Sequence, residues 1–251
     1  MEPGELSVVI LCGGRGTRLQ ERTRSIPKPL VEIGGRPIVW HVIGLYLAHG
    51  FRDFVLCTGY KGALVERFAA AEPWPPGVRV RCLDTGLDTP TGGRLRRALE
   101  AGAGAAAGAI CATYADGLAD VDLRALLAFH RGHGALATMT VVRPRLPYGV
   151  ADVDGDGRVR GFREKPRAEH WVNGGFLCLQ REAIAYLDDD AELERAPLER
   201  LAADGQLRAF RHDGFWQCMD TYKDAVRLND LWAAGDPPWR RPAPAPEPVG
   251  T

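Results

Sequence analysis

The stretch that decides the fold is Leu11-Cys12-Gly13-Gly14-Arg15-Gly16-Thr17-Arg18-Leu19, followed by Pro27-Lys28-Pro29. It comes directly after an apolar, β-branched segment, residues 6–10, which predicts a buried first strand. Glycines after a strand leave backbone amides open to a bulky anion, because they carry no Cβ and tolerate positive φ. Arg15, Arg18 and Lys28 add positive charge. The stretch therefore predicts a polyphosphate-binding loop, with a plain strand-to-helix turn as the alternative.

Two other phosphate-binding motifs do not fit this spacing. A P-loop requires Lys followed by Ser or Thr directly after its last glycine, whereas Gly16 is followed by Thr17 and Arg18. The dinucleotide-binding fingerprint requires a further glycine at the position that Leu19 occupies. Neither an ordinary NTPase loop nor a dinucleotide site is predicted.

Composition narrows the class of protein. The length of 251 residues fits one α/β domain, or one domain with a small appendage, and 45% hydrophobic residues are enough for an ordinary core. The 32 basic residues balance 32 acidic ones, so we expect no nucleic-acid partner and no membrane partner. The six cysteines include no C-x-x-C pair, and no signal peptide precedes them. We therefore expect free thiols and a cytoplasmic location.

Apolar strand-like segments alternate with helical ones through residue 142. Predicted strands lie at 53–58, 78–83, 109–113 and 135–142, and predicted helices at 38–49, 64–71, from about 93, and at 122–130. Continuous apolar strands are typical of a parallel sheet that is buried on both faces. We therefore predict a Rossmann-like, doubly wound α/β fold with a mostly parallel mixed sheet, whose ligands bind at the carboxyl ends of the strands.

The pattern changes after residue 142. Residues at about 143–172 form a charged, turn-rich excursion, with a predicted hairpin around Asp154-Gly155-Asp156-Gly157, and we expect it to fold over the site as its substrate-side wall. Further elements are predicted at 171–179, 181–187, 197–203, 207–210 and 221–234. Residues 1–236 are predicted to be a single domain, and the Pro- and Ala-rich residues 237–251 a disordered tail.

Two acidic residues each follow a strand-like segment. A lone Asp in that position is more often a turn or cap residue, and Asp220 is suited to cap the last helix. Asp116 and Asp220 together, at one edge of the sheet and near a polyphosphate loop, offer the oxygen ligands that Mg²⁺ shares with phosphate. We therefore expect Mg²⁺ on this pair.

A second glycine-rich loop contains Asp84-Thr85-Gly86 and Thr91-Gly92-Gly93-Arg94. It is either an N-cap with a flexible lead-in or a surface that packs against a nucleobase. The pair His130 and His133 closes a helix without a third ligand nearby, so a zinc site is not predicted.

The G-G-x-G-T-R-L stretch with P-K-P resembles the signature of the sugar-1-phosphate nucleotidylyltransferases. The D-T-G and T-G-G-R-L stretches are most similar to the glucose-1-phosphate cytidylyltransferases in that family, and the resemblance runs from Val8 to about Trp239. Three features depart from the family pattern: Ala115 replaces a glycine, Ala196 replaces an acid, and the segment 68–84 is shorter.

The resemblance implies transfer of a cytidylyl group from CTP to glucose 1-phosphate, giving CDP-glucose and pyrophosphate, by a homo-oligomeric enzyme. It implies catalytic roles for Arg18, Lys28 and Lys165. It implies nucleotide binding by Leu11, Gly13, Gly14, Arg15, Gly16, Thr17, Thr91, Gly92, Gly93 and Arg94. It implies sugar-phosphate binding by Tyr148, Gly149, Glu164, Lys165, Asn173 and Gly174.

Two alternatives remain at this point. One keeps the chemistry but changes the acceptor, to another sugar, cyclitol or phosphonate phosphate, or changes the NTP. The other is a catalytically silent relative that binds a nucleotide sugar and regulates a partner. The joint presence of Lys28, Asp116, Lys165 and Asp220 speaks against the silent relative.

Overall fold

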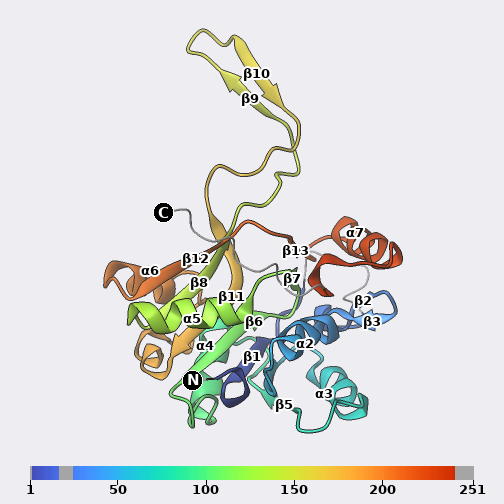
Figure 1. The fold of residues 1–251 in the computed structure, drawn as a ribbon, viewed down its shortest axis with the longest axis vertical. Helices are drawn as coiled ribbons and strands as arrows, with labels where there is room; N and C mark the ends of the chain where they lie inside the picture. The colour runs from blue at the N-terminus through green and yellow to red at the C-terminus, as the bar shows by residue number, and fades with distance from the viewer. Residues whose placement is uncertain (1, 17–24, 241–251) are drawn as a thin grey trace.

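A seven-stranded sheet forms the centre of the structure, a computed structural model that describes residues 2–16 and 25–240 (Figure 1). Its order is β12 (Leu207–His212), β8 (Ala137–Val142), β11 (Val172–Gln180), β6 (Ala109–Tyr114), β1 (Ser7–Leu11), β4 (Asp53–Thr58) and β5 (Arg79–Asp84). β11 runs antiparallel to both of its neighbours, and the other neighbouring pairs are parallel. The predicted mostly parallel mixed sheet is confirmed.

Helices cover both faces of the sheet. Val8 and Ile10 belong to one apolar core and Val9 to the other, because successive residues of a strand face opposite sides. The first core includes side chains of α2 (Ile38–Ala48), α3 (Gly62–Ala71), α5 (Leu123–His133) and α7 (Tyr222–Ala233). The second includes side chains of α4 (Thr91–Glu100) and α6 (Ala196–Ala203). The fold is therefore doubly wound, as predicted.

Short elements that the sequence did not predict complete the edge where the strands end. β7 (Gly117–Ala119) pairs antiparallel with β13 (Trp216–Cys218), and Met219 N donates to Asp116 O at 2.9 Å. This pairing places Asp220, which follows Met219, beside Asp116. A second small pair, β2 (Glu32–Ile33) and β3 (Arg36–Pro37), follows the 3₁₀ turn η3 (Lys28–Leu30). Two further 3₁₀ turns are η1 (Pro3–Glu5) and η4 (Arg181–Tyr186).

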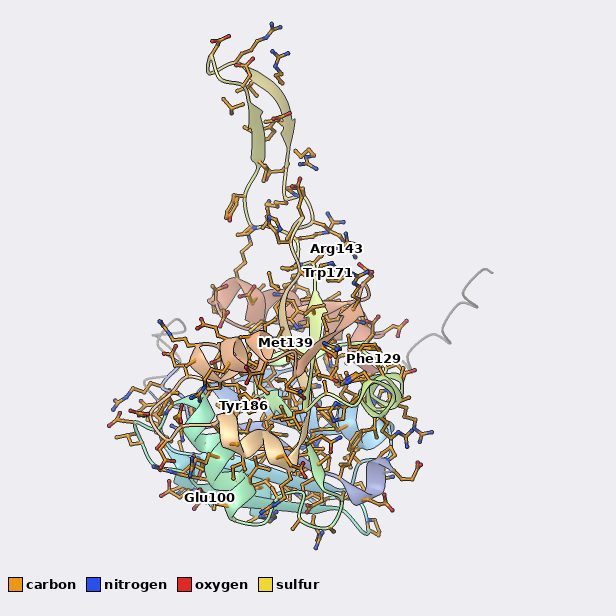
Figure 2. All side chains as sticks on the ribbon, turned by 90° about the vertical axis from the view of Figure 1, so that its left-hand side faces the viewer. Glu100, Phe129, Met139, Arg143, Trp171 and Tyr186 are labelled. Atoms are coloured by element: carbon orange, nitrogen blue, oxygen red, sulfur yellow. The ribbon has the colours of Figure 1, made fainter. Side chains whose placement is uncertain are left out.

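The predicted hairpin is present, but it does not fold over the central sheet and its helices, which we call the body. β9 (Val150–Val153) and β10 (Val159–Arg163) pair antiparallel and project far from the sheet on two extended segments (Figure 1). We call residues 143–172 the arm. Arg143 and Trp171 lie together at its base, with the guanidinium carbon 4.6 Å from the ring centroid (Figure 2). The hairpin therefore does not fold over the chain's own site as expected, whereas residues at the base of the arm line a cavity beside Asp220.

The predicted disorder from residue 237 is also wrong for its first residues. Pro238–Arg240 forms a 3₁₀ turn (η5), and Trp239 is only 3% exposed. Its Nε1 donates to His41 Nδ1 at 3.4 Å, and its ring packs against Phe215. A large apolar ring within a Pro- and Ala-rich stretch anchors it to the core. Residues 241–251 lie outside the described part of the chain.

All six cysteines are free thiols. Within residues 2–16 and 25–240, no helix combines the length and the apolar character that crossing a membrane requires.

Candidate active site

The first glycine loop leaves β1 at the carboxyl edge of the sheet. Cys12 N donates to Cys57 O at 2.9 Å, and Tyr60 N donates to Gly13 O at 3.1 Å, so this loop is bound to the one that follows β4. Gly16 has a φ of 62°, a left-handed conformation that glycine adopts without a steric penalty. The predicted residues Thr17 and Arg18 lie outside the described part of the chain.

A cavity of about 600 Å³ opens beside this loop. Nine of the predicted residues line it: Leu11, Gly13, Gly14, Gly16, Lys28, Thr91, Arg94, Asp116 and Asp220. The structure thus gathers residues from widely separated parts of the sequence, from Leu11 to Asp220. The two predicted glycine loops face the same space.

Arg15 joins the two loops. Its Nη2 donates to Asp88 Oδ1 at 2.8 Å, and Asp88 lines the cavity. Both side chains are exposed, so the ion pair contributes little to stability. The pair holds a charged side chain at the edge of the predicted phosphate site.

Lys28 lies at the centre of the charged groups. Its Nζ donates to Asp116 Oδ2 at 2.5 Å and to Asp220 Oδ1 at 2.7 Å, and its side chain is 14% exposed. Burial opposes the charge of the ammonium, but the two carboxylates outweigh it and raise the pKa of Lys28 above its ordinary value. Lys28 therefore remains a cation at every physiological pH.

The same carboxylates fit a divalent cation. Donor atoms of Asp116, Cys218 and Asp220 all lie within 4.8 Å of one another. Burial and the two acidic neighbours raise the pKa of the Cys218 thiol, so that it stays protonated and is a poor ligand. The bound ammonium of Lys28 shows that a positive charge is accommodated between the two aspartates. Asp116 and Asp220 are the residues suited to hold Mg²⁺.

Gly92 and Gly93 have a different role from the predicted one. A Cβ at Gly92 would lie 2.5 Å from Ala191 O, and a Cβ at Gly93 would lie 2.2 Å from Asp189 O. Both glycines are buried in the first turn of α4, against that backbone, and neither lines the cavity. Their prediction as nucleotide-binding residues is therefore wrong, because the space that they leave is filled by the chain itself.

Arg94 is also placed differently from the prediction. Its side chain is 3% exposed, and its guanidinium donates to backbone carbonyls and one hydroxyl of the surrounding loops. Both terminal nitrogens of the guanidinium are engaged in this way, which leaves them unavailable to donate to a nucleotide. Its prediction as a direct ligand is corrected.

The comparisons with known proteins agree with this geometry. The family model described as "Nucleotidyl transferase" matches residues 7–224. The chain belongs to the nucleotidyl transferase family. The glucose-1-phosphate cytidylyltransferase of Salmonella typhi is 41% identical over 94% of this chain and 99% of its own length. The probable glucose-1-phosphate cytidylyltransferase of Bacillus subtilis is 36% identical with the same coverage. The crystal structure of HddC from Yersinia pseudotuberculosis, at 23% identity, has a TM-score of 0.70 over 90% of this chain and 99% of its own, which confirms the fold.

The predicted sugar-side residues of this nucleotidyltransferase fall into two groups, one on the arm and one on β11. Tyr148, Gly149 and Glu164 are on the arm, where Tyr148 is 62% exposed. Lys165 pairs with Glu164 at 3.4 Å and lines a second cavity of about 900 Å³. Asp220 lines both cavities, so Lys28 and Lys165 face neighbouring spaces that share one carboxylate.

Asn173 and Gly174 stand behind the walls of these cavities. Asn173 Nδ2 donates to the Tyr114 hydroxyl at 3.2 Å, and Tyr114 lines the first cavity. Gly174 O accepts from Trp216 Nε1 at 2.8 Å, and Trp216 lines the second. Both predicted residues therefore support wall residues.

Sequence reasoning missed Glu194 and Tyr114. Glu194 Oε2 accepts from Thr91 Oγ1 at 2.7 Å, and its Oε1 accepts a short hydrogen bond from the Tyr114 hydroxyl. Burial and the nearby carboxylate raise the pKa of Tyr114, which keeps the phenol protonated as the donor. Sequence reasoning did not connect Glu194 with Thr91, because the two residues are 103 positions apart.

The second cavity of the enzyme is rich in cations. Its lining includes Arg143, Arg145, Lys165, Arg167, Lys223 and Arg227, against the acids Asp213, Asp220 and Asp224. Such an excess of positive charge favours an anionic substrate group on this side of Asp220.

Proposed function

We propose that this chain transfers a cytidylyl group from CTP to glucose 1-phosphate, giving CDP-glucose and pyrophosphate. The observation that carries the proposal is the position of Lys28, an ammonium bound by Asp116 and Asp220 in a cavity that the glycine loop of β1 lines. The choice of CTP and glucose 1-phosphate is supported by relatives that are cytidylyltransferases over nearly their whole length.

The chemistry that these residues supply is positioning and charge neutralisation. The attacking group is a phosphate oxygen that is already ionised, so no general base is required. The phosphate oxygen attacks the α-phosphorus of CTP in line, and pyrophosphate leaves. Lys28, and Arg15 and Arg18 of the first loop, offset negative charge on the triphosphate, and Lys165 faces the sugar phosphate. Removing one such cation is expected to cost about 10²- to 10³-fold in rate.

Mg²⁺ is part of the proposal. Asp116 and Asp220 would hold it, and when bound it supplies charge neutralisation on phosphate oxygens. The support is the pair of carboxylates, which the β7–β13 ladder and the Met219-to-Asp116 hydrogen bond bring together from distant parts of the chain.

A homo-oligomer is proposed as the working form. The arm exposes Val153, Val159 and Phe162 at 54%, 57% and 64%, and a monomer in water gains nothing from apolar side chains in that position. The predicted sugar-side residues Tyr148 and Glu164 are on the same arm, so a second copy would bring them into use. A cytoplasmic location is proposed from the six free thiols and the requirement for CTP.

The test is a pyrophosphate-release screen of the purified chain with Mg²⁺. Each of the four ribonucleoside triphosphates is paired with glucose 1-phosphate and with a panel of other sugar and cyclitol phosphates. The expected result is the highest kcat/KM for CTP with glucose 1-phosphate. A higher value for another pair would replace the substrate assignment, and release with no pair would favour a silent binding protein.

A further inference from the structure

Arg94 donates hydrogen bonds to five acceptors in loops at the edge of the sheet. Its Nη1 donates to Thr58 O at 2.8 Å, Thr85 Oγ1 at 2.7 Å and Gly86 O at 2.9 Å. Its Nη2 donates to Gly13 O at 3.1 Å and Leu87 O at 3.2 Å. All five acceptors are neutral, and four of them are backbone carbonyls.

These acceptors belong to three different loops. Gly13 follows β1, Thr58 ends β4, and the segment from Thr85 to Leu87 follows β5. Arg94 itself is in the first turn of α4, and from there its side chain reaches back beneath all three. The parallel strands β1, β4 and β5 are neighbours in the sheet, so a single planar guanidinium fixes the spacing of three consecutive loops.

The glycines of these loops are shaped around the guanidinium. A Cβ at Gly13 would lie 2.0 Å from Arg94 Nη1, and a Cβ at Gly59 would lie 2.6 Å from the same atom. The missing side chain at Gly13 therefore makes room for Arg94 as well as for a ligand on its other side. Glycine at both positions and arginine at 94 form one packing unit.

Arg94 also carries charge beneath the cavity. A guanidinium keeps its proton in a protein, and here it is 3% exposed at the floor of the space where the triphosphate is proposed to bind. The acceptors of its two terminal nitrogens are four carbonyls and one hydroxyl, all neutral, so its net charge remains to act on an anion above the loops.

We propose that Arg94 is the positioning residue of the nucleotide site: it holds the loops after β1, β4 and β5 in the arrangement that binds CTP, without touching CTP. The proposal rests on the proposed cytidylyl transfer for the identity of the nucleotide. It differs from direct recognition because it makes CTP affinity depend on Thr85, which contacts Arg94 but does not line the cavity. A lysine keeps the charge but cannot reach five acceptors in a planar fork, so it cannot replace the arginine.

The experiment compares Arg94→Lys with Arg96→Lys in the full-length protein. Arg96 is on the same helix, but its guanidinium contacts Glu100 and Leu187 O, away from the loops. Each variant is measured for KM and kcat with both substrates, for CTP affinity by calorimetry without the acceptor, and for thermal unfolding. We expect Arg94→Lys to raise the KM and Kd for CTP by about 10- to 100-fold, with the KM for glucose 1-phosphate within about twofold. Arg96→Lys should match the wild type.

A second variant keeps the test decisive if Arg94→Lys does not fold. Thr85→Val removes one acceptor of the guanidinium at a residue that is 0% exposed and so cannot touch a nucleotide. We expect a rise of roughly 3- to 10-fold in the Kd for CTP. Unchanged CTP affinity in a folded Arg94→Lys or Thr85→Val protein would overturn the proposal.

The two proposals fail in distinguishable ways. If the wild type binds CTP but releases no pyrophosphate with glucose 1-phosphate, the proposed reaction is wrong and the calorimetric comparison still decides the role of Arg94. If the screen selects another nucleotide, the same variants are measured with that nucleotide, and an unchanged affinity there overturns the positioning role.

Discussion

The loops around Arg94 and the arm around Phe162 differ in how far contacts within one chain bury their side chains. Arg94 is 3% exposed, and five acceptors from three loops surround its guanidinium. Phe162 is 64% exposed, on a strand whose residues are all exposed. The loops around Arg94 are packed and hydrogen-bonded by residues of the same chain, whereas the arm presents an apolar surface to water.

The same difference separates the two parts of the proposed site: the nucleotide half, which binds CTP, and the acceptor half, which binds the sugar phosphate. The groups that face the triphosphate, the glycine loop with Lys28 and the two aspartates, are held by contacts within one chain. Tyr148 and Glu164, predicted for the sugar phosphate, are on the arm and face solvent. We infer that the nucleotide half is complete in one chain and that the acceptor half depends on association.

The largest effect is expected at the carboxylates of the nucleotide half. Asp220→Asn removes the charge that binds Lys28 and that would hold Mg²⁺, and we expect kcat to fall by about 10³-fold or more. Thermal unfolding should change little, because the Asp220 side chain is 38% exposed. Asp230→Asn, on the exposed side of α7, is the matched control and should retain full activity. An active, metal-dependent Asp220→Asn protein would contradict the site.

The next effect is expected on the arm. Phe162→Glu places a charge on the exposed apolar surface, and we expect it to weaken self-association by roughly 100-fold, because a buried charge without a partner is costly. Light scattering after gel filtration should show the mass shifting towards the 27.4 kDa of one chain. Phe129→Glu is the control, because Phe129 is 40% exposed on α5, away from the arm. If the wild type is itself a monomer, the dependence on association is wrong.

Stability of the body, as distinct from the arm, should depend on pH through a buried histidine. Burial first, and then the neighbouring His133, lower the pKa of His130 to about 4, below its unfolded value. Between those two values the unfolded chain binds the proton and the folded chain does not, so the free energy of unfolding rises with pH. From pH 5 to pH 7 the gain is about 2 kcal/mol.

Urea unfolding of the wild type and of His130→Gln at both pH values measures this contribution. Gln keeps a hydrogen-bonding group near Thr138, which His130 Nδ1 contacts at 2.8 Å, but it does not titrate. The pH dependence should therefore be smaller in the variant. Equal pH dependence in the two proteins would show that His130 is protonated to the same extent when folded and unfolded.

The smallest effect is expected at a link within the wall of the first cavity. Glu194 accepts from both Thr91 and Tyr114, and Glu194→Gln leaves one acceptor oxygen for two donors. Loss of one hydrogen bond is expected to raise the KM for CTP by about 3- to 10-fold. Glu199→Gln, on the exposed face of α6, is the control. No change in Glu194→Gln would mean that the link does not support the nucleotide loop.

The sequence alone predicts those features that depend on local pattern. The apolar run before Gly13 predicts β1 and its loop, and two acids after strands predict the Asp116 and Asp220 pair, which the structure brings together around Lys28. Both depend on residues whose neighbours in sequence already show strand, turn and charge.

Long-range contacts could not be predicted in the same way. The hydrogen bonds of Arg94 join residues as far as 81 positions apart. The T-G-G-R stretch by itself is equally consistent with a loop that binds a nucleotide. Gly92 and Gly93 pack against a backbone segment near residue 190 that no local signal connects to them. The projection of the arm is likewise not encoded by its turns, because a hairpin pattern gives pairing but not direction.

The division of the site between the body and the arm is tested most directly by the KM values for both substrates in two variants, one from each region. Arg94→Lys should raise the KM for CTP and leave that for glucose 1-phosphate within about twofold, whereas Phe162→Glu should raise the KM for glucose 1-phosphate by about tenfold or more and leave the affinity for CTP unchanged. If both variants instead raise both constants together, the nucleotide half is not complete within one chain, and the division of the site between the body and the arm is wrong.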